Sequence, residues 1–232
     1  MYLVLRMARR LPTSARASRR VALLVVLGAA LLLVACGSED GGADATVIGD
    51  TGADDRSPAM VAESQPRPSF VLTDTSGARF DFQAETEGFL TLLYFGYTNC
   101  PDVCPVHFGN IAGALDQIPS SLRGRVKVIF VGVDPPRDSA ERLRSWLDHF
   151  DATFIGLTGT DDELRAAQVA AGVPPAQREP ADENGRYAVS HAAWVTAYTA
   201  GDEETWWFPL GIRQATWAST IEELAQIGRT DS

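Results

Sequence analysis

The strongest constraint on the fold of this chain is a pair of cysteines that closely follows an apolar run of strand length. Residues 89–95, Phe-Leu-Thr-Leu-Leu-Tyr-Phe, precede Cys100 and Cys104. A continuous apolar run of this length predicts a strand that is covered on both faces of a sheet. Cysteines in a Cys-x-x-x-Cys spacing lie one turn apart on one face of a helix, where their thiolates suit Cu(I) or Zn(II). The pattern therefore predicts a thiol site, for metal binding, redox chemistry or both, where a buried strand meets a helix.

Strand and helix patterns alternate through the rest of the folded region. From residue 69 onward about 160 residues remain, which is enough for one core. The expected strands are a hairpin within 70–80, single strands at 126–133 and 153–157, and a late hairpin formed by 189–198 and 205–208. The expected helices are 106–118, 138–150, 161–171 and 215–227. This order predicts an α/β domain of three layers, with a central mixed sheet flanked by helices, and the Cys motif at a helix start favours the thioredoxin-like version.

The first 35 residues have the pattern of an export signal. Six arginines precede an apolar stretch of 14 residues, Val21–Val34. This stretch is shorter than the roughly 20 residues that cross a membrane and is typical of a signal-peptide core. It ends in Leu-Val-Ala-Cys-Gly, which resembles the lipobox of bacterial lipoproteins, and that resemblance implies cleavage before Cys36 and a lipid on its sulfur. We therefore expect a protein anchored to the cell membrane on the extracytoplasmic side; an ordinary signal peptide with an incidental cysteine is the alternative.

Charge and cysteine number bound the partners of the mature chain. Residues 36–67 are small, acidic and proline-containing, and are expected to form a flexible linker to a folded domain at 68–230. Loss of the six arginines leaves 14 basic against 30 acidic residues, a net charge of −16. This charge excludes nucleic acid as a partner and leaves the lipid as the tether. With Cys36 acylated, Cys100 and Cys104 remain as an even pair in an oxidising compartment, and we expect a redox disulfide between them.

Three motifs in the expected domain together resemble the Sco/SenC family. They are Tyr-Phe-Gly-Tyr-Thr-x-Cys-Pro-Asp-x-Cys-Pro at 94–105, Gly-Val-Asp-Pro-x-Arg-Asp at 132–138 and Tyr-x-x-Ser-His at 187–191. The resemblance implies a thioredoxin-fold copper chaperone that helps to assemble the dinuclear copper centre of cytochrome c oxidase. It implies that Cys100, Cys104 and His191 hold copper, as Cu(I) or Cu(II). It also implies delivery to subunit II of that oxidase, after loading by a periplasmic copper donor.

The histidines leave alternatives for the third ligand open. His191 lies between apolar halves of an expected strand and could instead be a hydrogen-bonded core residue. His107 follows Cys104 by three residues, so a regular helix would form a self-contained Cys-Cys-His site. Against this, the two prolines of the motif indicate that the helix does not extend back to Cys100. His149 is expected to be an exposed surface residue.

Charged residues follow the second buried strand at the edge of the sheet that also carries the cysteines. Asp138 or Ser139 is expected to cap the next helix, and Asp138 is also expected to form a surface ion pair. For Asp134 two roles stay open, which are support of the metal loop and membership of a docking face.

Two functions other than copper delivery are compatible with parts of the sequence. A thiol-disulfide oxidoreductase could keep the copper-site cysteines of oxidase subunit II reduced. The spacing is not the Cys-x-x-Cys of thioredoxins, however, and no proline between 180 and 209 can supply their cis-proline. A peroxiredoxin-type peroxidase fits Phe-x-Leu-x-Asp-x-x-Gly at 70–77, but no proline shortly precedes Thr98. The expected role is therefore that of a carrier, not of an enzyme.

Overall fold

The computed structural model describes residues 60–62, 65–202 and 204–227 of the 232-residue chain. The expected signal peptide, Cys36 and most of the expected linker lie outside the described residues. Within the described ranges, none of the helices has both the length and the apolar character that a membrane crossing needs.

A mixed sheet of eight strands forms the centre of the described part, in the order β1-β10-β9-β4-β5-β6-β2-β3. Its parallel core consists of β4 (Leu90–Gly96), β5 (Val126–Gly132) and β6 (Ile155–Thr158). Antiparallel strands extend it on both sides, namely β9 (Val195–Tyr198), β10 (Thr205–Phe208), β1 (Met60–Ala62), β2 (Val71–Asp74) and β3 (Arg79–Asp81). All residues of β4 are buried, as expected for a strand between two neighbours that is covered on both faces.

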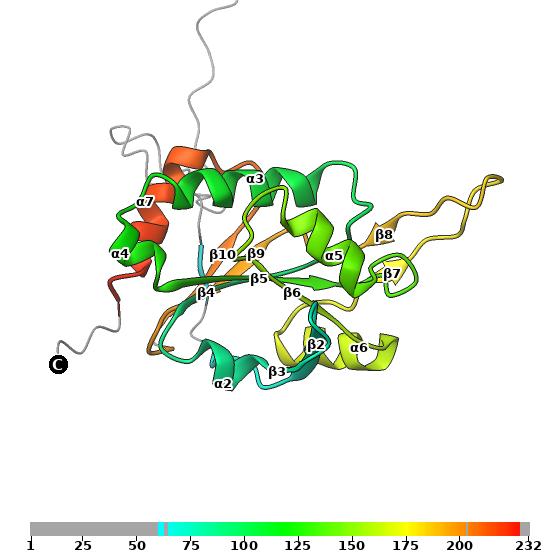
Figure 1. Ribbon diagram of the computed structural model, residues 1–232, viewed down its shortest axis with the longest axis horizontal. Coiled ribbons are helices and arrows are strands. Elements are labelled where there is room, and N and C mark those ends of the chain that lie inside the picture. The colour runs from blue at the N-terminus through cyan, green and yellow to red at the C-terminus, as the bar shows by residue number, and fades with distance from the viewer. Residues whose placement is uncertain (1–59, 63–64, 203, 228–232) are drawn as a thin grey trace, which may run out of the picture. The chain divides into compact units, whose positions relative to one another are not determined.

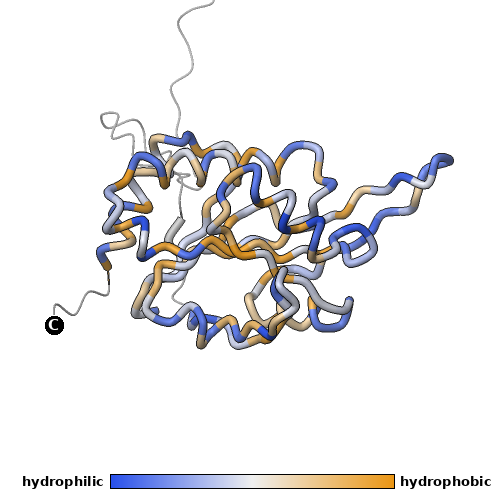
Figure 2. The backbone as a smooth tube through the Cα atoms, in the orientation of Figure 1, coloured by the Kyte–Doolittle hydropathy of each residue, from blue (hydrophilic) through white to orange (hydrophobic). Residues whose placement is uncertain are grey.

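Helices cover both faces of this sheet (Figure 1). On one face lie α3 (Val103–Leu115) and α5 (Ala140–Leu147), and α7 (Gln214–Leu224) packs against α3. On the other lie α2 (Phe82–Thr86) and α6 (Asp161–Ala170), while α4 (Ser120–Arg123) is a single turn before β5. Apolar residues concentrate in the central strands (Figure 2). The predicted α/β fold of three layers is therefore confirmed.

The helix that follows the Cys motif begins at Val103, not at the predicted residue 106. The Asp102 side chain accepts a hydrogen bond of 2.6 Å from the backbone N–H of Val103 and caps the helix. Pro105 then lies in the first turn, where a backbone N–H would have no partner within the helix. The predicted boundary was wrong because that proline is compatible with the first turn. As a result, Cys104 lies on the helix and Cys100 lies before it.

The predicted strand at 189–198 is in fact two strands that belong to different sheets. β8 (Val189–Ser190) pairs with β7 (Gln177–Arg178), whereas β9 pairs with β10. Figure 1 shows the β7–β8 hairpin extending away from the central sheet. Residues 191–194 between β8 and β9 belong to neither a helix nor a strand. His191 is the first residue of this segment and directly follows β8, so the hairpin contributes to its position.

Candidate metal centre

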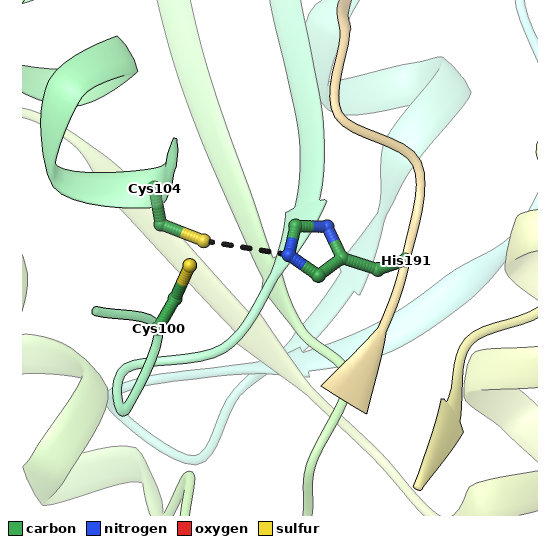
Figure 3. A group of neighbouring side chains, drawn as sticks. All are labelled: Cys100, Cys104 and His191. Atoms are coloured by element: carbon green, nitrogen blue, oxygen red, sulfur yellow. Dashed lines mark hydrogen bonds between the residues drawn. The ribbon is translucent and has the colours of Figure 1, made fainter. Parts of the chain in front are cut away.

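Three side chains from distant parts of the sequence meet beyond the end of β4 (Figure 3). The thiols of Cys100 and Cys104 and the imidazole of His191 each place one ligand atom within 4.8 Å of the others. The Sγ atom of Cys104 lies 3.8 Å from Nε2 of His191. Among the described residues, this is the one group of three or more histidine, cysteine or acidic side chains that could hold a metal ion. The structure therefore brings together the three residues that the sequence singled out.

The loop that carries Cys100 is held by a buried carboxylate. Asp138 accepts hydrogen bonds from the backbone N–H of Thr98 at 2.9 Å and from its hydroxyl at 2.7 Å. Asp138 is fully buried, and burial raises its pKa while the hydrogen bonds from Thr98 oppose that rise. Of the two expected caps, Ser139 is the one that caps α5. The expectation of a surface role for Asp138 was wrong, because its buried carboxylate satisfies buried donors of the thiol loop.

Gly96, the last residue of β4, leaves the space that the sulfur of Cys104 occupies. A Cβ atom at position 96 would lie 2.9 Å from Sγ of Cys104, 2.7 Å from Cε1 of Tyr94 and 3.0 Å from Cε2 of Phe130. Such distances are too short for carbon in a close-packed interior. The absence of a side chain at Gly96 therefore allows the helix to bring its thiol against the end of the strand.

The hydrogen bonds of His191 determine which ring nitrogen can bind a metal. Its Nδ1 atom lies 2.9 Å from the carbonyl oxygen of Ala192. A carbonyl oxygen only accepts, so Nδ1 must carry the proton in the neutral ring. The Nε2 atom then has a free lone pair and faces Cys104. The backbone thus orients the imidazole and selects the tautomer that a metal site needs.

The two thiols have opposite electrostatic environments. A hydrogen bond from Cys104 lowers the pKa of Cys100 to about 4, despite the opposing effect of burial. Burial raises the pKa of Cys104, and the negative charge of the Cys100 thiolate raises it further. Without metal, the pair therefore holds one proton, which lies on the fully buried Cys104. Both cysteines are free in the structure, and the disulfide between them stays a prediction.

Tyr94 is a part of the site whose contact the sequence did not predict. Its hydroxyl lies 3.7 Å from Sγ of Cys104, and its ring lies edge-on to the ring of His191 with centroids 5.8 Å apart. Tyr97 packs against His191 in a similar way, at 5.5 Å. A tyrosine hydroxyl within a fully buried strand needs a partner. That requirement is the signal in the sequence by which the contact could have been found.

The other histidines lie outside the group. His107 is buried in the first half of α3, and its Nε2 atom is 3.0 Å from the carbonyl oxygen of Ala193. The alternative site with His107 as the third ligand therefore finds no support in the structure. His149 is exposed, as expected, and its Nδ1 atom is 2.6 Å from the carbonyl oxygen of Ser145.

Asp134 supports the hairpin that presents His191. This carboxylate is fully buried and forms ion pairs with Arg137 and Arg178, the latter at 3.1 Å. It also accepts a hydrogen bond of 3.0 Å from the hydroxyl of Tyr187. Arg178 lies in β7 and Tyr187 lies just before β8, so one carboxylate holds both arms of the hairpin base. Of the two roles left open, burial favours support of the site over membership of a docking face.

The fold and the site define a thioredoxin-like domain with a candidate metal centre of two thiols and one imidazole. Residues 59–226 match the SCO1/SenC family, and the chain belongs to this family. A SCO2-like protein of Rickettsia felis is 31% identical over 126 residues, which cover 54% of this chain and 60% of that relative.

Solved structures extend the comparison. Bradyrhizobium japonicum ScoI with copper bound is 29% identical with a TM-score of 0.60, and the match covers 70% of this chain and 99% of that one. Yeast Sco1 with copper bound is 25% identical with a TM-score of 0.64, and the match covers 73% of this chain and 92% of that one. The predictions of the family and of a thioredoxin-like fold are therefore confirmed.

The close approach at Gly96 leads to a test of packing. We expect Gly96→Ala to lower the free energy of unfolding by about 2 kcal/mol, because the new methyl group must displace the Cys104 sulfur or an aromatic ring. Gly109→Ala is the matched control. Position 109 is exposed on α3 with no atom within 4 Å of an added Cβ, and alanine there should add up to about 1 kcal/mol. Urea unfolding measures both, and equal stability of the two variants would contradict the packing argument.

The opposed pKa values of the thiols lead to a second test. In the reduced, metal-free protein, we expect the ultraviolet absorbance of one thiolate per molecule at neutral pH. Because the folded-state pKa of Cys100 is lowered, this signal should persist as the pH falls and should disappear through about pH 4. Cys104→Ala removes the main hydrogen-bond donor and should move the loss to a higher pH, while Cys100→Ala should abolish the signal. A signal that survives in Cys100→Ala would show that the thiolate is assigned to the wrong sulfur.

Proposed function

We propose that this protein is an extracytoplasmic copper metallochaperone that carries copper on Cys100, Cys104 and His191. The observation that supports it most directly is the convergence of two thiols and one imidazole within 4.8 Å in a member of the SCO1/SenC family. Two solved relatives of this family have copper bound. Copper is the cargo of the protein, and no substrate is turned over.

The donor set suits both oxidation states of copper. Two thiolates are soft ligands that select Cu(I), and a neutral imidazole is a ligand that copper accepts in either state. Together they leave one net negative charge on a Cu(I) site and none on a Cu(II) site. Loading requires the loss of the proton on Cys104, whereas Cys100 is already a thiolate. The free lone pair on Nε2 of His191 needs no proton transfer.

The ligands differ in their exposure. Cys104 is fully buried, Cys100 is 8% exposed and His191 is partly exposed. Copper therefore enters and leaves past Cys100 and His191, and Cys104 is the ligand that an acceptor reaches last. This order suits a carrier, because an acceptor can replace Cys100 and His191 before the Cys104 thiolate releases copper.

The acceptor that we propose is the dinuclear copper site of cytochrome c oxidase subunit II, with loading by a periplasmic copper donor. The Sco/SenC motifs of the sequence support this assignment, and the net charge of −16 of the expected mature chain argues against nucleic acid. Purified subunit II domain with reduced cysteines is the acceptor to use in a transfer measurement.

Copper binding by the reduced domain, begun at residue 38, tests the proposed ligands. In an anaerobic Cu(I) titration against a competing chelator we expect tight binding of one equivalent. His191→Ala should weaken the affinity about tenfold or more, since even partners of a ligand contribute that much. Cys100→Ser should lose tight binding, and His149→Ala is the control with an exposed histidine and should equal the wild type. Weak binding by the wild type would overturn the copper proposal.

Thiol-disulfide exchange is the alternative function, and the asymmetry of the thiol pair favours it. A nucleophilic Cys100 thiolate could attack a disulfide of subunit II, and Cys104 could then resolve the mixed disulfide, so that two electrons pass to the target. The protein would be left with a Cys100–Cys104 disulfide that an external dithiol must reduce. Catalytic disulfide reduction together with weak Cu(I) binding would establish this alternative.

Attachment to the membrane is the remaining part of the proposal. Residues 1–35 are proposed to be removed as a lipoprotein signal peptide, and Cys36 to carry the lipid ahead of a flexible acidic linker. This linker is shorter than the expected 36–67, because Met60–Ala62 already pair with β10 and Arg67 is buried in the domain. In a bacterial host we expect the wild type in the membrane fraction with the mass of a lipid-modified chain. Cys36→Ser should lack the lipid mass, whereas Cys100→Ser should keep it. A wild-type protein cleaved elsewhere and without lipid would leave an ordinary export signal.

A further inference from the structure

The segment that carries His191 is held by few hydrogen bonds. Residues 191–194 connect β8 to β9 without regular secondary structure. Apart from strand pairing and the contacts of His191 with the two thiols, the hydrogen bonds found for this segment in the described part of the chain are two. One is local, from Nδ1 of His191 to the carbonyl oxygen of Ala192. The other comes from a different element, α3, and joins His107 to Ala193 at 3.0 Å.

His107 is placed to act as a rigid link between the two halves of the site. It lies one turn after Cys104 on α3, and its side chain is 1% exposed. Its ring packs against those of Tyr94 and Trp217, with centroids 5.2 Å and 6.2 Å away. Since the Ala193 carbonyl only accepts, Nε2 of His107 must carry the proton and donate. A ring packed on two sides has little freedom to move, so its hydrogen bond couples the position of residues 191–194 to that of α3.

We propose that His107 is a positioning residue, which holds the His191 segment in register with the helix that carries Cys104 by donating a hydrogen bond to the carbonyl oxygen of Ala193. His107 does not touch the metal. It acts through the backbone, two residues beyond the imidazole ligand. The inference rests on the proposed copper function, because it assigns His107 a part in assembling that site.

The oxidation states of copper should depend on this link to different extents. When the imidazole is displaced part of the time, the two thiolates keep more of the Cu(I) affinity than of the Cu(II) affinity, because Cu(I) prefers soft sulfur ligands and Cu(II) favours additional nitrogen or oxygen ligands. A segment that loses its link to α3 presents His191 less often in the binding position. The population of the complete three-ligand site then falls, and Cu(II) affinity falls with it.

The test compares three variants of the full-length protein. His107→Leu keeps an apolar side chain but removes the donor, and we expect Cu(II) affinity to fall about tenfold while Cu(I) affinity changes less than about threefold. His107→Gln keeps an N–H donor on a side chain of similar reach and should restore most of the Cu(II) affinity. Ile111→Ala is the control, because it truncates a fully buried residue one turn further along α3 without removing a hydrogen bond.

Affinities for the two ions are measured separately by competition, with the thiolate-to-copper charge-transfer absorbance for Cu(II) and thermal unfolding of the metal-free protein as further readouts. The proposal expects a weakened and shifted charge-transfer band in His107→Leu only. Equal losses in His107→Leu and Ile111→Ala, or no rescue by His107→Gln, would overturn it and leave His107 as a core residue. Absence of copper binding by the wild type would instead be a failure of the proposed function, which the same titration reveals first.

Discussion

The site depends on the burial of β4 between β5 and β9, because this strand sets the position of the first ligands. Its seven residues are all buried, and the parallel pairing with β5 continues to its last residue, Gly96. Because β4 pairs with a strand on each edge and is covered on both faces, the position of its last residue is fixed. The chain then turns through residues 97–102, and the helix capped by Asp102 begins at Val103. The missing side chain at Gly96 leaves room for the Cys104 sulfur at the end of the strand. The end of β4 therefore helps to set the position of this candidate ligand.

The imidazole is positioned by a separate and less direct set of contacts. Asp134 follows β5 and holds both arms of the β7–β8 hairpin through Arg178 and Tyr187. Three partners around a buried carboxylate satisfy its lone pairs, which is the condition under which a buried charge can persist. His191 emerges from that hairpin, and the carbonyl oxygen of Ala192 selects its tautomer. The donor set therefore forms only when two separate features are both in place, which are the end of β4 for the thiols and the ion-pair cluster around Asp134 for the imidazole.

How much the sequence predicted follows from how local each feature is. The longer strands and helices and the placement of the cysteines after a buried strand are properties of single segments, and they were predicted with errors in their ends. The short elements β1, α2, α4 and β7 were missed. The division of 189–198 into β8 and β9 was missed, because both halves are apolar and only the choice of pairing partner separates them. The roles of Asp138 and His107 were missed because each depends on a hydrogen-bond partner that is distant in the sequence. A carboxylate just before a helix is typical of an N-cap. Its hydrogen-bond donor is Thr98, 40 residues earlier, and the local sequence does not indicate that contact.

The contrast between the two halves of the site has a consequence for copper transfer. The thiols are positioned by a central strand, a capped helix and close packing. The imidazole lies on a segment without regular secondary structure. Tyr94 and Tyr97 pack their rings against His191, and His107 donates a hydrogen bond to the same segment. A carrier has to bind its cargo tightly and still release it, and one ligand that can move gives an acceptor a way in without unfolding the rest. Under the proposed function, His191 is therefore the ligand expected to move first, and the buried Cys104 is the ligand expected to hold copper until the acceptor has bound.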